Sequence, residues 1–248
     1  MKKIYFTPSL FIAIVSIVFS SCSEDDKGEI IPNNPINGQS TAVFNPDVTH
    51  GTMTDYEGNI YKTVTIGTQT WMAENLRTTK YNDDTAIPNV TDDAEWEALT
   101  TGAYCNYNNT TGTDTIATYG RLYNWHAVNT GKLAPASWHV PTDAEWATLI
   151  DYLGGIGVAG GKLKETGTTH WNSSNSGTTN ETGFTALPGG FCSDIGTFYD
   201  GGKNGFWWSA SEVSTDIARA LYVNLHYSDV FSSSSPKKVG ISVRCVKN

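Results

Sequence analysis

Cys22 is the residue whose type and position most directly imply chemistry in this sequence of 248 residues. It follows the small pair Ser20–Ser21, an apolar run over residues 10–19 and a basic amino terminus. These three parts are typical of a secretory signal peptide, and the apolar run is too short to cross a membrane. We therefore predict a lipoprotein signal peptide over residues 1–21, with lipid attached to the thiol of Cys22. Ordinary secretion, with an unmodified Cys22, is the alternative.

The residues after Cys22 indicate where the anchored chain is displayed. Residues 23–26 (SEDD) resemble the signal by which bacteria of the Bacteroidetes type send lipoproteins to the outer face of the outer membrane. Acylation gives several lipid chains, which hold a membrane more firmly than one chain does. Polar residues and prolines over 22–48 indicate a flexible tether. We expect an outer-membrane, lipid-anchored and surface-exposed protein, with an acylated cysteine and tether over 22–48 and one domain over 49–248.

Cys105, Cys192 and Cys245 are the cysteines that follow the anchor. An odd number of them in an oxidising compartment permits one disulfide and one free thiol, or no disulfide. The cysteines are far apart and the five histidines lack ligand spacing, so we expect no transition-metal site. Calcium stays open as a cofactor, because Glu74–Asn75 and residues 82–84 (NDD) offer oxygen ligands, although neither segment completes a ligand loop.

Sequence motifs assign no catalytic residue. A nucleophile elbow, a zinc-binding HExxH helix, a phosphate loop and a dinucleotide fingerprint are absent from the sequence. His139 lies near Asp143 and Glu145, but its neighbours favour a packed strand-to-helix junction over acid–base chemistry. The alternative is an extracellular enzyme that acts on glycan or protein through a carboxylate pair formed on folding, or through a reactive Cys192. We predict a protein that is not an enzyme.

Aromatic, amide and acidic side chains between residues 171 and 212 are candidates for ligand binding. Tryptophan rings can stack on sugar faces, while amides and carboxylates bind sugar hydroxyls. The alternative is that these tryptophans pack the core as alternate residues of a strand. The predicted ligand-binding residues are Trp171, Asn172, Asn180, Glu181, Trp207, Trp208 and Glu212.

Short strands and few helices are expected to position these side chains. Thr142 and Glu145 form a capping box before an apolar stripe that predicts a helix ending near Leu153. Asp92 begins a similar, shorter pattern. This second pattern predicts a helix over 92–99, and a third helix is expected over 122–128. Strands are expected over residues 60–66, 70–72, 205–209, 218–225 and 239–246. The fold class is therefore α+β, with small twisted antiparallel sheets, two or three helices and long loops.

Composition narrows the function further. The formal net charge of −9 becomes −11 when the two lysines of residues 1–21 are removed, which argues against a nucleic-acid partner. Eight Trp, twelve Tyr and 24 Gly against three Met indicate a loop-rich fold packed by aromatic rings. A chain of this length can bury one substantial core.

A set of strings spread over the sequence carries a family likeness. They are WMAENL (71–76), YGRLYNW (119–125), WHVPTDAEW (138–146), FTALPGG (184–190), WWS (207–209) and SVRCV (242–246). Together, over about residues 52–247, the chain resembles the Fibrobacter succinogenes major paralogous domain family of exported, often lipid-anchored proteins. Cys105 and Cys245 lie in strings typical of that family and Cys192 does not, so the resemblance implies a disulfide between Cys105 and Cys245.

A more distant likeness concerns the fold. VPTDAEW (140–146), followed much later by GISVRCV (240–246), is similar to the C-type-lectin-like and formylglycine-generating-enzyme group. The resemblance implies a C-type-lectin-like fold in which the last strand returns beside the first. A fold likeness does not transfer function.

From these observations we expect a surface-anchored, non-enzymatic recognition or adhesion module. The expected partners are the membrane, through the lipid anchor, and a glycan or a surface protein. Clustered tryptophans support carbohydrate binding, and missing catalytic motifs argue against an enzyme. A purely structural surface component is a further alternative.

Overall fold

The structure is a computed structural model that describes residues 1–3 and 38–248. Most of the predicted signal peptide and the predicted lipid-bearing Cys22 therefore lie outside the described residues. Within the part of the chain that the structure describes, no helix is both long and apolar enough to cross a membrane. The fold described below is that of residues 38–248, which belong to the compact unit beginning at Asn34.

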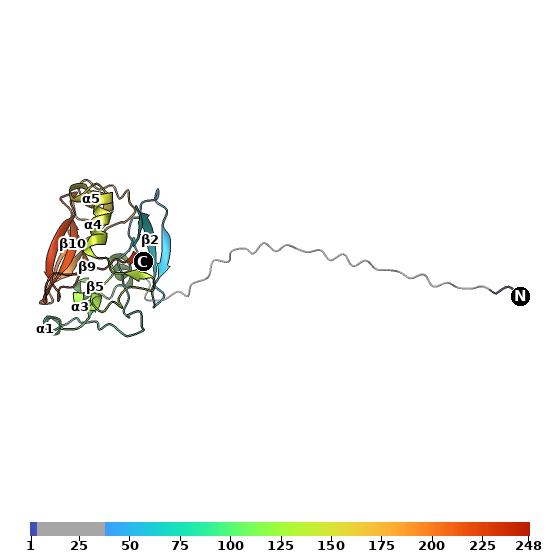
Figure 1. Cartoon of the computed structure of the whole chain (residues 1–248), viewed down its shortest axis with the longest axis horizontal. Coiled ribbons are helices and arrows are strands. Elements are labelled where there is room, and N and C mark those ends of the chain that lie inside the picture. Colours follow the sequence, from blue (N-terminus) through green and yellow to red (C-terminus); the bar gives the residue numbers. More distant parts are fainter. Residues whose placement is uncertain (4–37) are drawn as a thin grey trace. The chain divides into compact units, whose positions relative to one another are not determined.

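The first sheet brings the beginning and the end of the domain together. Its strand order is β1-β2-β3-β12-β6. The strands β1 (Gly51–Thr54), β2 (Ile60–Ile66) and β3 (Gln69–Met72) form an antiparallel meander. The last strand, β12 (Val246–Lys247), then pairs with β3 on one side and with β6 (Trp138–His139) on the other. In Figure 1 the carboxyl terminus accordingly lies on the side of the domain that carries this sheet.

The second sheet has the order β11-β10-β9. Its strands are β9 (Asn204–Glu212), β10 (Ile217–Asn224) and β11 (Phe231–Pro236), all antiparallel. Successive side chains of a strand point to opposite faces. Trp207 packs into a cluster on one face and Trp208 into a cluster on the other, so this sheet is buried on both sides at β9.

Two short hairpins complete the sheets. One joins β4 (Tyr104–Cys105) to β5 (Leu122–Tyr123), and the other joins β7 (Gly189–Cys192) to β8 (Phe198–Gly201). The segment before β12 was expected to be a strand over 239–246. It instead makes isolated bridges to different elements, so it has no continuous ladder. That prediction was wrong except at its end, while the strands expected over 205–209 and 218–225 are confirmed as β9 and β10.

The helices are short and begin at polar caps. The capping box of Thr142 and Glu145 is present before α4 (Asp143–Tyr152), and Asp92 caps α1 (Asp93–Glu97), as predicted. The helix expected over 122–128 starts late, because β5 comes first and Asn124 then caps α3 (Trp125–Val128). The remaining helical segments are η1 (Tyr107–Asn109), α2 (Thr113–Tyr119) and α5 (Ile156–Leu163).

The core consists of three clusters of buried side chains. Tyr123 and Trp208 are central to the first, Trp71 and Trp146 to the second, and Trp96 to a smaller third. In the second cluster the rings of Trp71 and Trp146 lie 4.6 Å apart, and Phe184 packs against both. Aromatic packing therefore holds together an α+β fold of small antiparallel sheets and few helices, which confirms the predicted class.

Candidate functional site

The three tryptophans predicted to bind ligand are buried. Trp171, Trp207 and Trp208 expose 1%, 2% and 0% of their surface. Their indole N–H groups donate to Ala186 O, Asn75 Oδ1 and Tyr123 O respectively. A ring without solvent access cannot stack on a sugar, so the prediction that these residues bind ligand was wrong. The reason for Trp207 and Trp208 is that both faces of the sheet are covered at β9, while Trp171 packs into the second core cluster.

The polar members of the predicted set are dispersed. Asn180 is buried and accepts the backbone N–H of Thr185, which fixes a turn. Glu181 forms an ion pair with Lys162 at 3.1 Å, and Glu212 forms one with Lys237. The structure does not bring these side chains together into one site. Asn172 differs from them, because it is exposed and lies beside the glycines of a pocket described next.

A pocket of about 210 Å³ opens between α2, η1 and the β7–β8 hairpin, and we call it the tyrosine pocket. Two half-buried rings, Tyr107 and Tyr119, form its walls. The amide of Asn172 lies against Gly202 at its edge, and the Asn172 backbone N–H donates to Gly202 O at 2.8 Å. The lining residues are Tyr107, Thr115, Tyr119, Pro188, Gly189, Gly201 and Gly202.

Glycine in the hairpin makes this shape possible. A Cβ atom at Gly201 would lie 2.6 Å from the Tyr107 ring, and one at Gly190 would lie 2.4 Å from Tyr199 O. Because Gly201 has no side chain, its N–H can donate to the Tyr107 hydroxyl at 3.0 Å. The Tyr107 ring also packs edge-on against Phe198, with centroids 5.5 Å apart. The Tyr107 wall is thus fixed by the hairpin that forms the floor.

Tyr119 forms the opposite wall and is held by its neighbours. Its ring lies edge-on to His170, with centroids 5.7 Å apart. Burial and the negative charge of Glu165 raise the pKa of the Tyr119 phenol, so the hydroxyl stays protonated at neutral pH. The pocket therefore presents two phenol rings and backbone polar groups, with no charged side chain among its lining residues.

A row of aromatic rings starts on the same hairpin and crosses the second sheet. Phe206, Tyr222 and Phe231 are cross-strand neighbours in register, and cross-strand aromatic pairs stabilise a sheet. The rings at the two ends are 47% and 57% exposed. In order, the row is Tyr199, Phe191, Phe206, Tyr222, Phe231 and Tyr227, with centroids 5.5, 5.2, 5.2, 4.9 and 6.2 Å apart.

Residues 38–48, which we call the strap, are bound to the domain. The N–H of Thr41 donates to Thr118 Oγ1 at 2.9 Å, and the N–H of Val43 donates to Glu165 Oε1 at 2.6 Å. The predicted flexible tether therefore ends earlier than expected. This attachment could not be predicted from neighbouring residues, because the partners of the strap lie far along the chain.

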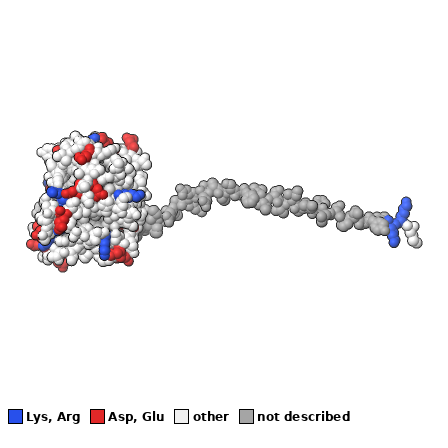
Figure 2. All heavy atoms as spheres, in the orientation of Figure 1, with Lys and Arg blue, Asp and Glu red and all other residues white. Residues whose placement is uncertain are grey.

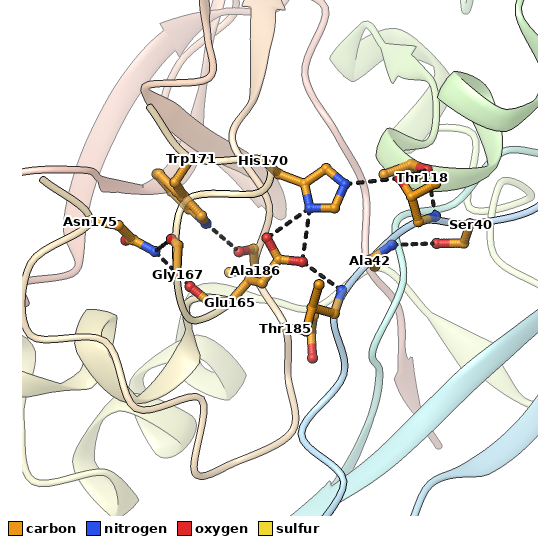
Figure 3. A network of polar contacts seen from close by, with 12 residues as sticks. Ser40, Ala42, Thr118, Glu165, Gly167, His170, Trp171, Asn175, Thr185 and Ala186 are labelled. Atoms are coloured by element: carbon orange, nitrogen blue, oxygen red, sulfur yellow. Dashed lines mark hydrogen bonds and ion pairs between the residues drawn. The ribbon is translucent and has the colours of Figure 1, made fainter. Parts of the chain in front are cut away.

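Glu165 and His170 hold the strap from the domain side (Figure 3). The Nδ1 atom of His170 lies 2.8 and 2.9 Å from the two carboxylate oxygens of Glu165, which is fully buried. The Nε2 atom lies 2.9 Å from Thr41 Oγ1, which in turn lies 3.0 Å from Thr118 Oγ1. Hydroxyl, imidazole and carboxylate thus stand in the order that activates a nucleophile in many hydrolases. The same contacts fasten the strap.

The oxygens considered for calcium already bind protein groups. Glu74 accepts the N–H of Lys62 at 2.5 Å and lies 3.9 Å from the Arg77 guanidinium. Hydrogen bonds from Lys132 and Thr85 lower the pKa of the exposed Asp83 to about 2. Across residues 38–248 the structure contains no group of three or more His, Cys, Asp or Glu side chains that could hold a metal ion.

The cysteines are arranged differently from the expected pairing. Cys105, Cys192 and Cys245 are buried and unbridged. Cys105 and Cys192 share the third core cluster and line the same crevice. Cys245 belongs to the first cluster, where its N–H contacts the sulfur of Met72 at 3.3 Å. The expected disulfide between Cys105 and Cys245 is therefore not formed, because the neighbour of Cys105 is Cys192.

His139 lies at the junction predicted for it. Its Nε2 atom lies 2.6 Å from a carboxylate oxygen of Glu145, and its Nδ1 atom lies 2.6 Å from the side-chain oxygen of Asn248. Since Glu145 also closes the capping box of α4, these contacts tie β6 to the helix.

On the face shown in Figure 2, lysine, arginine and acidic residues are interspersed, and no large field of one sign is visible.

The chain belongs to the family described as the Fibrobacter succinogenes major domain, whose model matches residues 64–247. This match covers most of the chain and confirms the resemblance carried by the sequence strings. Neither the comparison with curated proteins nor the comparison with solved structures gives a significant match. The membership assigns no activity, so function has to be argued from the sites described above.

Proposed function

We propose that the protein is a non-enzymatic recognition module, displayed at the outer face of the outer membrane by an acylated Cys22, that binds a sugar residue of a glycan in the tyrosine pocket. The tyrosine pocket is the observation that carries this proposal. It is concave, largely apolar and walled by the two aromatic rings of Tyr107 and Tyr119. Concave apolar sites with a few polar groups are where small ligands bind.

The chemistry of the pocket matches that of a sugar. A sugar ring has an apolar face of C–H groups, which packs on an aromatic ring, and a rim of hydroxyls, which needs hydrogen-bond partners. The rings of Tyr107 and Tyr119 offer the first kind of contact. The hydroxyl of Thr115, the amide of Asn172 and the glycine backbone offer the second. With about 210 Å³, the pocket suits one sugar residue better than a drug-sized ligand.

The proposed fold is C-type-lectin-like. It is supported by β12, the last strand, which joins the same sheet as the first strands, although its neighbour there is β3 and not β1 as the resemblance implied. The signal-peptide pattern and the SEDD string after Cys22 support the proposed anchor and surface display. A domain whose entry and exit lie in one sheet is well suited to display on a tether.

The proposal is tested with the full chain, extracted in detergent and applied to a glycan array with calcium or with a chelator. Binding should be lost in Tyr119→Ala and in Tyr107→Ala, provided that circular dichroism shows each variant to be folded. Tyr56→Ala removes a ring that is 56% exposed and does not line the pocket, so it should bind as the natural protein does. Silence across the array, or equal binding by all variants, would overturn the proposal.

A second candidate function is hydrolysis of an extracellular ester or peptide, and it rests on the order Thr41, His170, Glu165. In this case His170 Nε2 would take the proton of the Thr41 hydroxyl, and Glu165 would orient the imidazole. Turnover of fluorogenic ester or peptide substrates by the full chain should then vanish in Thr41→Val and persist in Thr110→Val, which alters a different hydroxyl. No turnover by the natural protein would sink this candidate.

A further inference from the structure

We propose that Cys105 and Cys192 form a disulfide in the exported protein, and that this bridge fastens one wall of the tyrosine pocket to its floor. The bridge goes beyond the proposed glycan binding and does not depend on it. It rests on the proposed export of the chain, since exported chains meet conditions in which disulfides persist.

The two thiols are already neighbours. Cys105 and Cys192 belong to the same cluster of buried side chains, and the Cys192 thiol contacts Ser193 O at 3.6 Å. Both cysteines line one narrow crevice beside Trp96 and Phe198 and are 1% exposed. Backbone bonds in both directions with Gly240 hold Cys192, and those within the β4–β5 hairpin hold Cys105. The fold therefore holds both cysteines in one crevice, where a disulfide can join them once their Cβ atoms come within about 4.5 Å.

The position of the pair gives the bridge a consequence for the pocket. Cys105 ends β4, two residues before the Tyr107 wall. Cys192 ends β7, which begins at the floor residue Gly189. These segments are distant in sequence, so a bridge between them closes a loop of about 90 residues, and closing loops of this size constrains the unfolded chain strongly. The bridge would keep wall and floor together when the domain fluctuates.

The bridge forms by thiol–disulfide exchange with a low-molecular-weight or protein disulfide. One cysteine loses its proton and its thiolate attacks the S–S bond of the oxidant, which releases one thiol and leaves a mixed disulfide. The second thiolate then displaces the remaining oxidant thiol, so that two electrons pass to the oxidant. Burial raises the pKa of Cys105 well above its ordinary value, which makes the thiolate scarce in the closed fold. We therefore place the exchange before the third cluster closes during folding.

The test uses the full chain extracted from cells in detergent, with N-ethylmaleimide present from lysis through denaturation. Protease digestion and mass spectrometry without reductant should show one joined pair of peptides that contain Cys105 and Cys192, and a maleimide on Cys245. In Cys192→Ser, Cys105 should carry a maleimide. Maleimide on both Cys105 and Cys192 of the exported protein would overturn the proposal, and so would a bridge that includes Cys245.

A second measurement does not depend on cellular export. The reduced full chain, refolded with oxidised glutathione, should join Cys105 to Cys192, and adding reductant should then lower Tm by about 10 °C. The Tm of Cys192→Ser should not respond to reductant. A refolded natural chain in which the two thiols stay separate would contradict the proposal. Because neither measurement uses a glycan, failure of the bridge and failure of glycan binding are distinguishable.

Discussion

Arg244 donates from Nε to the side-chain oxygen of Asn75 across 2.7 Å, and both residues are buried. The same oxygen of Asn75 accepts the indole N–H of Trp207 at 2.9 Å. The other guanidinium nitrogens donate to the carbonyls of Phe184 and Thr185. Burial lowers the pKa of Arg244 to about 9, yet it remains charged at neutral pH. A buried cation is thus balanced by one amide, two carbonyls and the nearby ring of Phe184.

Replacing Asn75 with alanine should be strongly destabilising. Arg244 Nε and Trp207 Nε1 would both lose their acceptor in a site without water access, and leaving a buried charge short of partners costs about 3–5 kcal/mol. Urea denaturation should show that loss in the free energy of unfolding. Asn129→Ala, at an exposed asparagine, should change it by less than about 0.5 kcal/mol. A loss below about 1 kcal/mol for Asn75→Ala would show that the amide is dispensable.

The strap should detach from the domain when the buried carboxylate of Glu165 is removed. Glu165→Ala takes away the acceptor of the Val43 N–H and of His170 Nδ1, so we expect a loss of about 2–4 kcal/mol in the free energy of unfolding. Limited proteolysis should then cut within residues 38–48 much faster than in the natural protein. Glu181→Ala changes an exposed glutamate and should leave the cleavage rate unchanged. Equal cleavage of both variants would mean that Glu165 does not fasten the strap.

Lys164 should make stability rise with pH in the alkaline range. Its side chain is buried and donates to the carbonyls of Ser176, Asn224 and Tyr227 at 3.3, 2.8 and 2.9 Å. Burial lowers the pKa of Lys164 from 10.5 to about 8. Between these two values the unfolded chain binds more protons than the folded chain, so this residue's contribution to stability increases as pH rises. The contribution of Lys164 to stability correspondingly decreases as the pH drops to about 8, the pKa of this residue in the folded chain.

The measurement is the free energy of unfolding of the natural protein minus that of Lys164→Met, obtained at about pH 7 and about pH 9.5. The difference should shift in favour of the natural protein by up to about 2 kcal/mol. Subtracting the variant removes the effect of the other lysines and tyrosines. Lys203→Met, at an exposed lysine, serves as the control and should show no such shift. A difference that is flat or falls with pH would contradict the prediction.

Local signals predicted those parts of the fold that depend on neighbouring residues. Thr142 and Glu145 are three residues apart, so their capping box could be identified from sequence, and α4 begins where it was expected. The tryptophan pair at 207 and 208 could not be interpreted in this way. Its strand was predicted, but the burial of both faces depends on residues such as Tyr123 and Phe184, which lie far away in the chain.

The candidate sites depend even more strongly on residues that are far apart in the chain, so their arrangement could not be predicted from local signals. Tyr107 and Tyr119 lie in segments that gave no functional signal, and they meet across a floor supplied by a hairpin about 80 residues later in the chain. Glu165 and His170 are close in sequence, but their partner Thr41 is 129 positions from His170. The family likeness pairs Cys105 with Cys245, whereas the fold places Cys105 in one buried cluster with Cys192. Long-range placement decided each of these outcomes.

Helix α5 supplies the last prediction, because its glycines have opposite surroundings. Glycine lowers helix stability relative to alanine, yet the sequence IGVAGGKL forms this helix. A Cβ atom at Gly160 would lie 2.2 Å from Asp229 O, whereas one at Gly157 meets nothing within 4 Å. The chain of residues 228–229 thus packs directly on the helix backbone. Close packing at Gly160 outweighs the poor helix propensity.

Alanine at these two positions should act in opposite directions. Gly157→Ala should raise the free energy of unfolding by about 0.5–1 kcal/mol, because it reduces the freedom of the unfolded chain without a clash. Gly160→Ala should lower it by about 1–3 kcal/mol, since the new methyl group must displace the backbone at Asp229. Thermal and urea denaturation of the two variants check both signs. If Gly160→Ala were also stabilising, the close contact between α5 and the residues before β11 would not hold in solution.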